Sequence, residues 1–581
     1  MTGDIDAPAK HAARPATPAA AAGRRRWLAI GIGGGCALAA LALWAAYIRL
    51  SQTFPTDSDG AGNAYQAWQM LHGNPLLRGW ELSDVSFYTT ELPQYMVVEL
   101  VTGLNANVIH VAAGMTYTLA LIGAVALAAG RARGWAAVIG GCIAAGIMLD
   151  PQGADGVLVL LSSPDHIGTS VPIMLAWLIL DRTRPSWAAA AAVSAVLAVA
   201  GVADSLVTYV AIAPLVLVVV IRLLHALLRD RAAGWRGTLT ERRYEIGLAA
   251  GAIAAAIVAR LALRLVAALG GFGSPAPVSS VGSVSHILRH NVPVVAHGLL
   301  LLFGADFLDY PVGPVLVLHL VSLALVVAGI AVTCWHFLTD LDLVAQLLLA
   351  GIVINLVVFV VSTNVSGLPT MREIDVVLPF GAALAGRQLG PWLGAAVAAR
   401  RRTGRGPGRG PGGRPGRGPW LARPAAAGVL VALGLVGVGY AVGLARQLTP
   451  HIQVSSEQRL AWWLEARGLD NGVGGYWQST SVSLVSGGRV QIRLVDIGYR
   501  LHPQQLVKGV REDYAGWYDT ADNTADFVVL APGDGEFAPF TDQAPILATF
   551  GRPARTYHFE QYTILVWPHR NLLTELVPYP S

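Results

Sequence analysis

Long apolar runs alternate with short polar segments along most of this chain. A bilayer core requires about 20 apolar residues per helix, and this requirement gives roughly eleven spans here. We place them near residues 27–50, 108–130, 135–149, 167–181, 187–202, 206–228, 244–269, 313–337, 343–362, 375–396 and 424–446. The pattern therefore predicts a polytopic α-helical membrane protein.

Composition and charge agree with that class. Of 581 residues, 54% are hydrophobic and 13% are charged, which is too few charges for the surface of a soluble protein of this length. The net charge of +5 comes from arginines that are concentrated in short segments. Because that placement reflects membrane topology, we expect no nucleic-acid partner.

The placement of arginine predicts the orientation in a cell membrane. The arginine-rich segments fall on one side of the membrane, the cytoplasm: Arg24 to Arg26, Arg131 and Arg133, Arg182 and Arg184, Arg229 to Arg243, and Arg400 to Arg423. Residues 1–26 then form a disordered cytoplasmic tail. Residues 397–423 form a basic Gly/Pro/Arg linker that acts as a flexible tether or binds anionic lipid. The segment 338–342, with Asp340 and Asp342 and no arginine, is an exception.

The chain changes character after the membrane domain of residues 27–446. Residues 447–581 contain strand-like runs and one amphipathic helical pattern, separated by Gly, Pro and Asp turns. We therefore expect a small extracytoplasmic α/β domain, with a helix at 457–467 and strands at 489–495, 525–531 and 562–567. Its aromatic residues either stack on sugar rings or pack in the core, as buried aromatics commonly do: Trp462, Trp463, Tyr476, Trp477, Trp517 and Tyr518.

The sequence lacks the motifs that several kinds of site require. Cys36, Cys142 and Cys334 lie in apolar segments and form no disulfide framework. The histidines of the outer segment 270–312 are scattered without a zinc-ligand motif: His286, His290 and His297. The sequence contains no P-loop, no dinucleotide fingerprint and no G-x-S-x-G elbow, which excludes nucleotide-driven transport and serine hydrolysis.

The first outer loop, residues 51–107, is long and polar for a chain of apolar helices. It combines carboxylates, which can act as bases, with aromatic rings, which suit sugars. Glu81, Asp84, Tyr88 and Glu91 either bind the hydroxyls and the apolar face of a sugar or belong to a solvated loop at the membrane interface.

In this loop, Asp59 is followed by GAGNAYQAWQMLHGN and then by FYTTELPQY before the next span. The arrangement resembles the first outer loop of the GT-C superfamily, membrane glycosyltransferases that use polyprenyl-phosphate-linked sugars, such as the protein mannosyltransferase and aminoarabinose transferase types. Asp59 stands where the family has an acid just beyond the first helix. Met70, Leu71 and Gly73 match a Met-Leu-x-Gly-like turn, and Pro93 matches a proline before the second span.

Two features depart from the family pattern. Gly60 stands where a second acid is usual, and no Lys-Pro-Pro or His-Pro-Pro sequence lies near Pro93. The missing acid weakens the case for a metal. We therefore assign no cofactor and leave a divalent cation open.

The resemblance implies sugar transfer, which requires a base for the acceptor hydroxyl and a cationic site for the departing phosphate. Asp59 is the first candidate for the base and Asp57 the second; alternatively, the two form an N-cap and turn for a helix that starts near Asn63. Arg372, in the short outer loop NVSGLPTMREID, stands where several GT-C families have an arginine that contacts the donor phosphate.

Two further pairs are candidates. Arg260 and Arg264 share one helix face near the outer end of a span, where they would bind a phosphate or extend to lipid headgroups. Asp165 and His166 precede another span. They would bind acceptor or donor phosphate or join Asp59 around a divalent cation, and the alternative is a helix N-cap or an interfacial turn.

These residues predict an integral membrane glycosyltransferase. It would move a sugar from a polyprenyl-phosphate-linked donor to a glycan or protein acceptor on the outer face of the membrane. The alternative is a non-catalytic transporter or assembly protein for lipid-linked saccharides. An enzyme requires that Asp59 share a site with Arg372 and the other outer loops.

Overall fold

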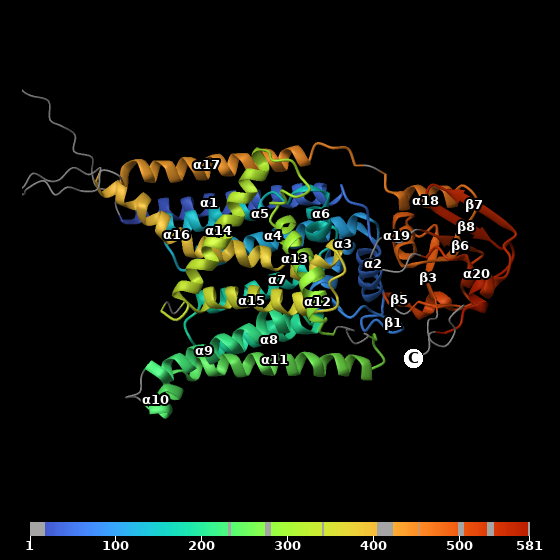
Figure 1. Cartoon of the computed structure of the whole chain (residues 1–581), viewed down its shortest axis with the longest axis horizontal. Coiled ribbons are helices and arrows are strands. Elements are labelled where there is room, and N and C mark those ends of the chain that lie inside the picture. The colour runs from blue at the N-terminus through green and yellow to red at the C-terminus, as the bar shows by residue number, and fades with distance from the viewer. Residues whose placement is uncertain are drawn as a thin grey trace, which may run out of the picture.

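The computed structural model describes residues 18–229, 234–273, 280–339, 342–403, 422–452, 454–497, 505–509, 511–531 and 540–578. Long helices form a body along most of the molecule, and an α/β domain lies at one end of it (Figure 1). The elements of the first outer loop lie where these two parts meet (Figure 1).

Every segment that the sequence predicts to span the membrane contains a helix. These helices are α1 (Pro18–Ser51), α4 (Asn107–Ala129), α5 (Trp135–Met148), α7 (Ile167–Arg182), α8 (Trp187–Ala203), α9 (Ala213–Arg229), α11 (Arg243–Ala268), α14 (Pro314–His336), α15 (Leu343–Val361), α16 (Val377–Thr403) and α17 (Ala422–Gln447). Among the described residues, six helices are long and apolar enough to cross a membrane, so the predicted count of about eleven is not confirmed. α5 and α8 are apolar but shorter.

Both predicted cytoplasmic segments differ at their borders from the prediction. α1 begins at Pro18, so residues 18–26 of the predicted disordered tail are helical. α16 continues to Thr403 and α17 begins at Ala422. The rest of the predicted tail, residues 1–17, and the predicted linker between these two helices lie outside the described residues.

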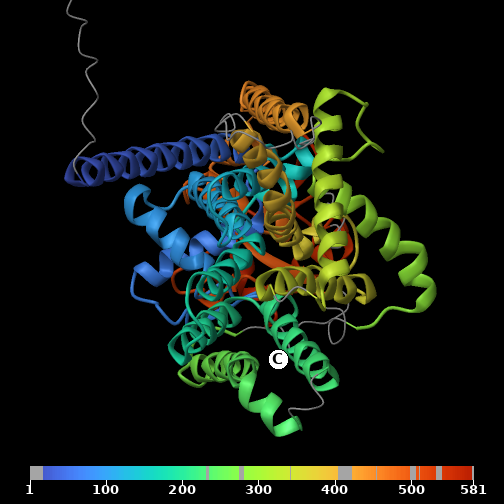
Figure 2. The ribbon, with the colours of Figure 1, turned by 90° about the vertical axis from the view of Figure 1, so that its left-hand side faces the viewer.

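The long helices expose large apolar side chains that a soluble protein would bury. On α11, Ile257 and Leu261 are each 54% exposed, and Val327 on α14 is 57% exposed. α1 leaves the side of the body, and only 6% of its apolar window is buried (Figure 2). Such surfaces require lipid as their solvent. The chain is a multi-pass membrane protein.

α5 and α16 approach each other through glycines. A Cβ on Gly140 would lie 2.7 Å from the carbonyl oxygen of Gly386, and a Cβ on Gly390 would lie 2.8 Å from that of Ala136. Small residues let helix backbones pack closely in lipid, where no hydrophobic effect drives helices together. This packing fixes α16, which directly follows the outer segment that carries Arg372.

Asp342 belongs to the acidic segment that was the exception to the placement of arginines. It pairs with an arginine from within a predicted span. Arg387 of α16 donates from Nη2 to Asp342 Oδ1 (2.9 Å) and to Asp181 Oδ1 (2.8 Å). Asp181, at the end of α7, is buried. The positive charge that the sequence lacks around Asp342 is therefore supplied by the neighbouring helix.

Shorter elements fill the polar segments between the long helices. They are α2 (Ser58–Leu71), β1 (Trp80–Glu81), α3 (Glu91–Thr102), α6 (Gly153–Leu161), η1 (Thr208–Ile212), α10 (Gly234–Glu241), α12 (Val284–His286), η2 (Ile287–Asn291), α13 (Val292–Leu302) and η3 (Leu368–Ile374). The predicted first loop is thus largely structured.

The C-terminal segment folds as a mixed α/β domain, as its sequence pattern predicts. Its elements are α18 (Ser456–Glu465), β2 (Asn471–Gly474), α19 (Tyr476–Val485), β3 (Gln491–Ile497), β4 (Leu506–Lys508), β5 (Asp513–Tyr514), η4 (Ala515–Tyr518), β6 (Phe527–Leu530), α20 (Gln543–Phe550), β7 (Arg555–Phe559), β8 (Tyr562–Val566) and η5 (Leu572–Glu575). Six strands form one sheet in the order β4-β3-β2-β6-β8-β7. β2 runs parallel to β3 and β6, and the other pairs are antiparallel.

A two-stranded ribbon joins this domain to the first outer loop. β1 pairs antiparallel with β5, so that Trp80 lies opposite Tyr514 and Glu81 opposite Asp513. The rings of Trp80 and Tyr514 stack with centroids 5.7 Å apart, and Trp517 meets Trp80 edge-on at 5.2 Å. Trp517 therefore packs at the junction. Packing was one of the two roles that the sequence left open for the aromatic residues of this domain, the other being stacking on sugar rings.

We predict that Arg387→Met lowers stability by on the order of 3 kcal/mol, because it leaves buried Asp181 and its neighbour Asp342 with less compensating charge. Thermal unfolding of the purified protein, followed by tryptophan fluorescence, measures the effect. Arg184→Met, at an exposed arginine, is the matched control. Equal melting temperatures for the two variants would contradict a structural role for this ion pair.

Candidate active site

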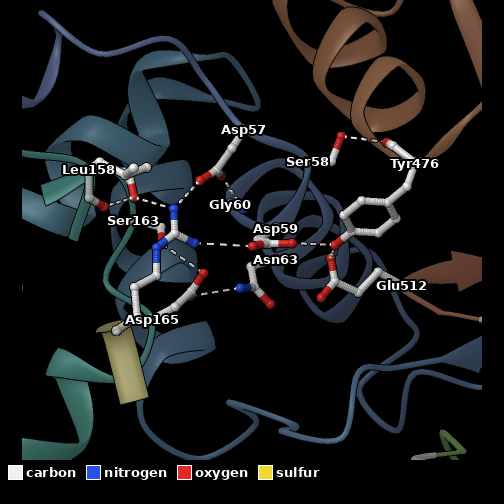
Figure 3. A network of polar contacts seen from close by, with 12 residues as sticks. Asp57, Ser58, Asp59, Gly60, Asn63, Leu158, Ser163, Asp165, Tyr476 and Glu512 are labelled. Atoms are coloured by element: carbon white, nitrogen blue, oxygen red, sulfur yellow. Dashed lines mark hydrogen bonds and ion pairs between the residues drawn. The ribbon is translucent and has the colours of Figure 1, made fainter. Parts of the chain in front are cut away.

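The guanidinium of Arg372 is the centre of a polar cluster formed by three distant segments. Arg372 lies in η3, between α15 and α16. It donates to Asp59 Oδ2 from Nη1 (3.1 Å), and from Nη2 to Asp57 Oδ2 (3.0 Å) and Ser162 Oγ (2.8 Å) (Figure 3). Its side chain is only 11% exposed. The structure thus brings two predicted site residues, Asp59 and Arg372, into direct contact.

Both acids stand at the N-terminus of α2. Asp57 is the N-cap, and its Oδ1 accepts a hydrogen bond from the backbone N–H of Gly60 (2.8 Å), while Asp59 lies in the first turn. α2 starts at Ser58 and not near Asn63, so Asp57 both caps the helix and pairs with Arg372. Unpaired N–H groups and the helix dipole favour carboxylates here.

The structure explains why a glycine follows Asp59. A Cβ on Gly60 would lie 2.9 Å from Cγ2 of Ile109, on the helix α4 that packs against α2. A larger acidic side chain at this position would have to displace the side chain of Ile109. The close approach of the two helices therefore accounts for the departure from the family pattern.

Two residues of the C-terminal domain complete the cluster, and sequence reasoning missed both roles. The Tyr476 hydroxyl hydrogen-bonds Asp59 Oδ1 and lies 2.5 Å from Glu512 Oε2 (Figure 3). Tyr476 is the first residue of α19, directly after β2, which is parallel to both of its neighbours. The carboxyl end of such a strand often carries functional residues, but the sequence pattern predicted no strand at β2, so this signal appears only in the structure. For Glu512, the sequence carries no comparable signal.

The predicted pair Asp165 and His166 does not converge on one target. Asp165 accepts hydrogen bonds from Asn63 Nδ2 (2.9 Å, to Oδ1) and Ser163 Oγ (2.7 Å, to Oδ2), beside the cluster. Burial raises the pKa of Asp165 to about 7, and the charges of the nearby aspartates Asp57 and Asp59 add to the rise.

His166 turns toward Asp204 instead. It occupies the N-cap position of α7, the alternative that the sequence left open, in the left-handed region (φ 60°), but its side chain makes no capping hydrogen bond. Its Nδ1 lies 3.5 Å from Asp204 Oδ2. Burial lowers the pKa of His166, yet the hydrogen bond and charge of Asp204 outweigh it and raise the pKa to about 10.

The cluster does not fit a divalent cation shared by Asp59, Asp165 and His166. The two α2 acids hold a guanidinium between them, and His166 faces Asp204. A different group, His297, Asp306 and Asp309, has ligand atoms within 4.8 Å of one another. The spacing of histidines in the sequence did not reveal this group, because its two acids, Asp306 and Asp309, lie beyond α13, the helix that contains His297.

The other predicted loop residues lie at separate places. Glu81 pairs with Asp513 in the ribbon, and Asp84 lies 3.8 Å from Arg511 Nη2. The Tyr88 hydroxyl donates to the carbonyl of Pro75 (2.7 Å). These contacts bind the loop to itself and to the C-terminal domain.

Glu91, at the start of α3, is buried near α7. A Cβ on Gly168 would overlap its carboxyl group. Burial raises the pKa of Glu91 to about 8. Arg260 and Arg264 are exposed on α11, and neither is among the residues that contact Asp57 or Asp59 in the described part of the chain.

Fold and site together define a multi-pass membrane protein in which the first outer loop, a late outer loop and a C-terminal α/β domain meet at one polar cluster. No protein-family model matches the chain, and a search of curated proteins gave no match.

Solved structures do match. ArnT from Cupriavidus metallidurans in the apo state is 16% identical, over 95% of this chain and 100% of that chain, with a TM-score of 0.50. ArnT bound to undecaprenyl phosphate is 14% identical, over 93% and 97%, with a TM-score of 0.49. The oligosaccharyltransferase AglB from Archaeoglobus fulgidus, in complex with an inhibitory peptide and a dolichol-phosphate, is 12% identical, over 84% and 69%, with a TM-score of 0.41. The chain shares the fold of ArnT, which is a member of the superfamily that the first outer loop resembles.

The raised pKa of Asp165 predicts a pH dependence of stability. The folded state binds this proton more tightly than the unfolded state, because the pKa rises from 3.8 to about 7 on folding. The stabilisation is complete below about pH 4 and is lost as the pH rises through about 7. In Asp165→Asn, we expect a smaller loss of melting temperature between these values than in the wild type.

Melting temperatures across this pH range, in a buffer series of constant ionic strength, test the expectation. Asp542→Asn, at the exposed N-cap of α20, is the control. Identical pH profiles for the wild type and Asp165→Asn would mean that the carboxyl group is ionised throughout.

Proposed function

We propose that the protein is an integral membrane glycosyltransferase. It moves a sugar from a polyprenyl-phosphate-linked donor to the hydroxyl of a glycan or protein acceptor on the outer face of the membrane. The observation that carries the proposal is the contact between Arg372 and the paired acids Asp57 and Asp59. The GT-C fold and the first-loop resemblance support the donor class.

In this proposal Asp59 is the base. It takes the acceptor proton while the acceptor oxygen bonds to the anomeric carbon and the bond from that carbon to the phosphate oxygen breaks. Asp59 is suited to this role because its side chain is 24% exposed, whereas that of Asp57 is 9% exposed and bonded to its own helix terminus.

Arg372 stabilises the negative charge of the departing phosphate. The guanidinium carries five N–H donors in a plane, and its Nε, which is buried, makes no hydrogen bond in the described part of the chain. A phosphate that shares the guanidinium weakens the pairing with Asp59. The Asp59 oxygen that Arg372 bonds then becomes available to the acceptor hydroxyl.

The proposal predicts that the purified protein in lipid nanodiscs transfers a sugar from at least one member of a panel of polyprenyl-phosphate sugars, with mass spectrometry as the readout. Asp59→Asn should lower the rate about a hundredfold or more, because general-base catalysis contributes about that much. Asp542→Asn makes the same chemical change at a surface helix cap and should keep the wild-type rate. Full activity in a folded Asp59→Asn variant would remove the base assignment, and movement of lipid-linked sugar without a new glycosidic bond would favour a transporter.

Arg372→Lys keeps the charge but loses the planar fork, so we expect the donor KM to rise about tenfold. Steady-state kinetics at varied donor concentration measure the effect. Arg260→Lys and Arg264→Lys make the same change at the exposed pair on α11. A larger effect of these two variants than of Arg372→Lys would transfer the phosphate assignment to α11.

A further inference from the structure

The C-terminal domain contributes a tyrosine and a glutamate to the carboxylate of Asp59. The Tyr476 hydroxyl oxygen lies between Asp59 Oδ1 and Glu512 Oε2 and is within hydrogen-bond distance of both. All three side chains come together where α19 and the segment before β5 meet the start of α2 (Figure 3).

The number of protons on these three groups determines which oxygen donates each hydrogen bond. A phenol has one O–H and can donate it to one acceptor. If both carboxyl groups were ionised, the phenol oxygen would face one of them at about 2.5 Å without a proton between them. One carboxyl group must therefore carry a second proton. Asp59 accepts from the Arg372 guanidinium through its other oxygen, so we place the second proton on Glu512.

The fold is shaped to hold Glu512 in this position. Its backbone adopts the left-handed region (φ 51°), which is unfavourable for a residue with a side chain, and it is 5% exposed. A Cβ on Gly62 of α2 would lie 2.9 Å from Glu512 Oε2, so only glycine leaves room for the carboxyl group. A left-handed backbone and so close a packing against Gly62 persist when the surrounding structure fixes them.

The charges around Glu512 support a neutral carboxyl group. The groups that face it are Tyr476 from α19, Asp59 from α2, Asp165 from the segment before α7, and its neighbour Arg511. Burial raises the pKa of Glu512 well above its usual range, and the charge of Asp59 raises it further, while Arg511 opposes the rise.

We propose that Tyr476 and Glu512 are positioning residues for the base Asp59. Glu512, protonated, donates to the Tyr476 oxygen, and Tyr476 donates its own proton to Asp59. The C-terminal domain thereby orients the base, so catalysis requires the domain to be docked. This inference rests on the proposed function, since it assigns Asp59 as the base.

The first test removes the tyrosine hydroxyl. In Tyr476→Phe, Asp59 loses the hydrogen-bond donor that orients its carboxylate and that pairs with its charged form. We expect the acidic limb of the kcat/KM profile to move up by about one pH unit, and kcat to fall about tenfold with little change in donor KM. Tyr562→Phe is the matched control, because Tyr562 is a buried tyrosine of the same domain that bonds another glutamate, Glu457 (3.5 Å).

The second test separates a protonated from an ionised Glu512. Glutamine has the shape of the neutral acid and keeps an N–H donor for Tyr476, whereas leucine has neither donor nor acceptor. We therefore expect Glu512→Gln to retain activity within about threefold of the wild type and Glu512→Leu to behave like Tyr476→Phe. A loss in Glu512→Gln as large as that in Asp59→Asn would overturn the proposal, and so would an unchanged pH profile in folded Tyr476→Phe.

An infrared measurement tests the inference without an activity assay. The difference spectrum between the wild type and Glu512→Gln near neutral pH should contain the carbonyl band of a protonated carboxylic acid, and Glu457→Gln should not remove it. If the band is present but no donor is used, the proposed function fails while the protonated Glu512 stands. If the wild type transfers sugar and the band is absent, only the inference fails.

Discussion

The ion pairs of Arg372 hold together parts of the chain that lie far apart in sequence. Arg372 and Asp59 are separated by 313 residues, yet the guanidinium bonds both acids at the start of α2. Burying a guanidinium is costly unless carboxylates and hydrogen bonds replace its water, and here two carboxylates and the Ser162 hydroxyl do so. This cation therefore ties η3 to the start of α2, and Asp59 links it onward to Tyr476 of the C-terminal domain.

One cation cannot offset every acid around it. Asp57, Asp59, Asp165 and Glu512 all lie near the guanidinium, and burial raises the pKa of Asp57, Asp165 and Glu512. Neutral carboxyl groups can donate as well as accept hydrogen bonds, so protonation removes repulsion and adds donors. The cluster thus gathers several acids, three of them with raised pKa values, around one cation, an arrangement that suits proton transfer.

Docking of the C-terminal domain joins the site to the membrane domain. The β1–β5 ribbon and the rings around Trp80 form the apolar part of the junction, and Tyr476 forms the polar part. Because Tyr476 opens a helix of the domain while Asp59 opens a helix of the first loop, a small rotation of the domain would change their contact. The proposed base is therefore sensitive to how the domain sits.

The sequence predicted the class of the fold, since apolar runs of bilayer length and strand-like alternation after residue 447 depend only on local composition. The resemblance of the first outer loop to the GT-C superfamily also placed Asp59 and Arg372 among the candidates. The sequence did not predict that Glu91 is buried near α7, nor that Arg387 pairs with Asp342, because both depend on which helices are neighbours.

What the sequence determined by itself was periodicity, span positions and a short set of charged loop residues. Only the tertiary structure decided which of these residues meet. It joined Asp57, Asp59 and Arg372, left Arg260 and Arg264 exposed on α11, and added Tyr476 and Glu512 from a domain more than 400 residues further along the chain from Asp59. The physical reason is that local patterns are set by neighbours in the chain, whereas burial, ion pairing and proton affinity are set by neighbours in space.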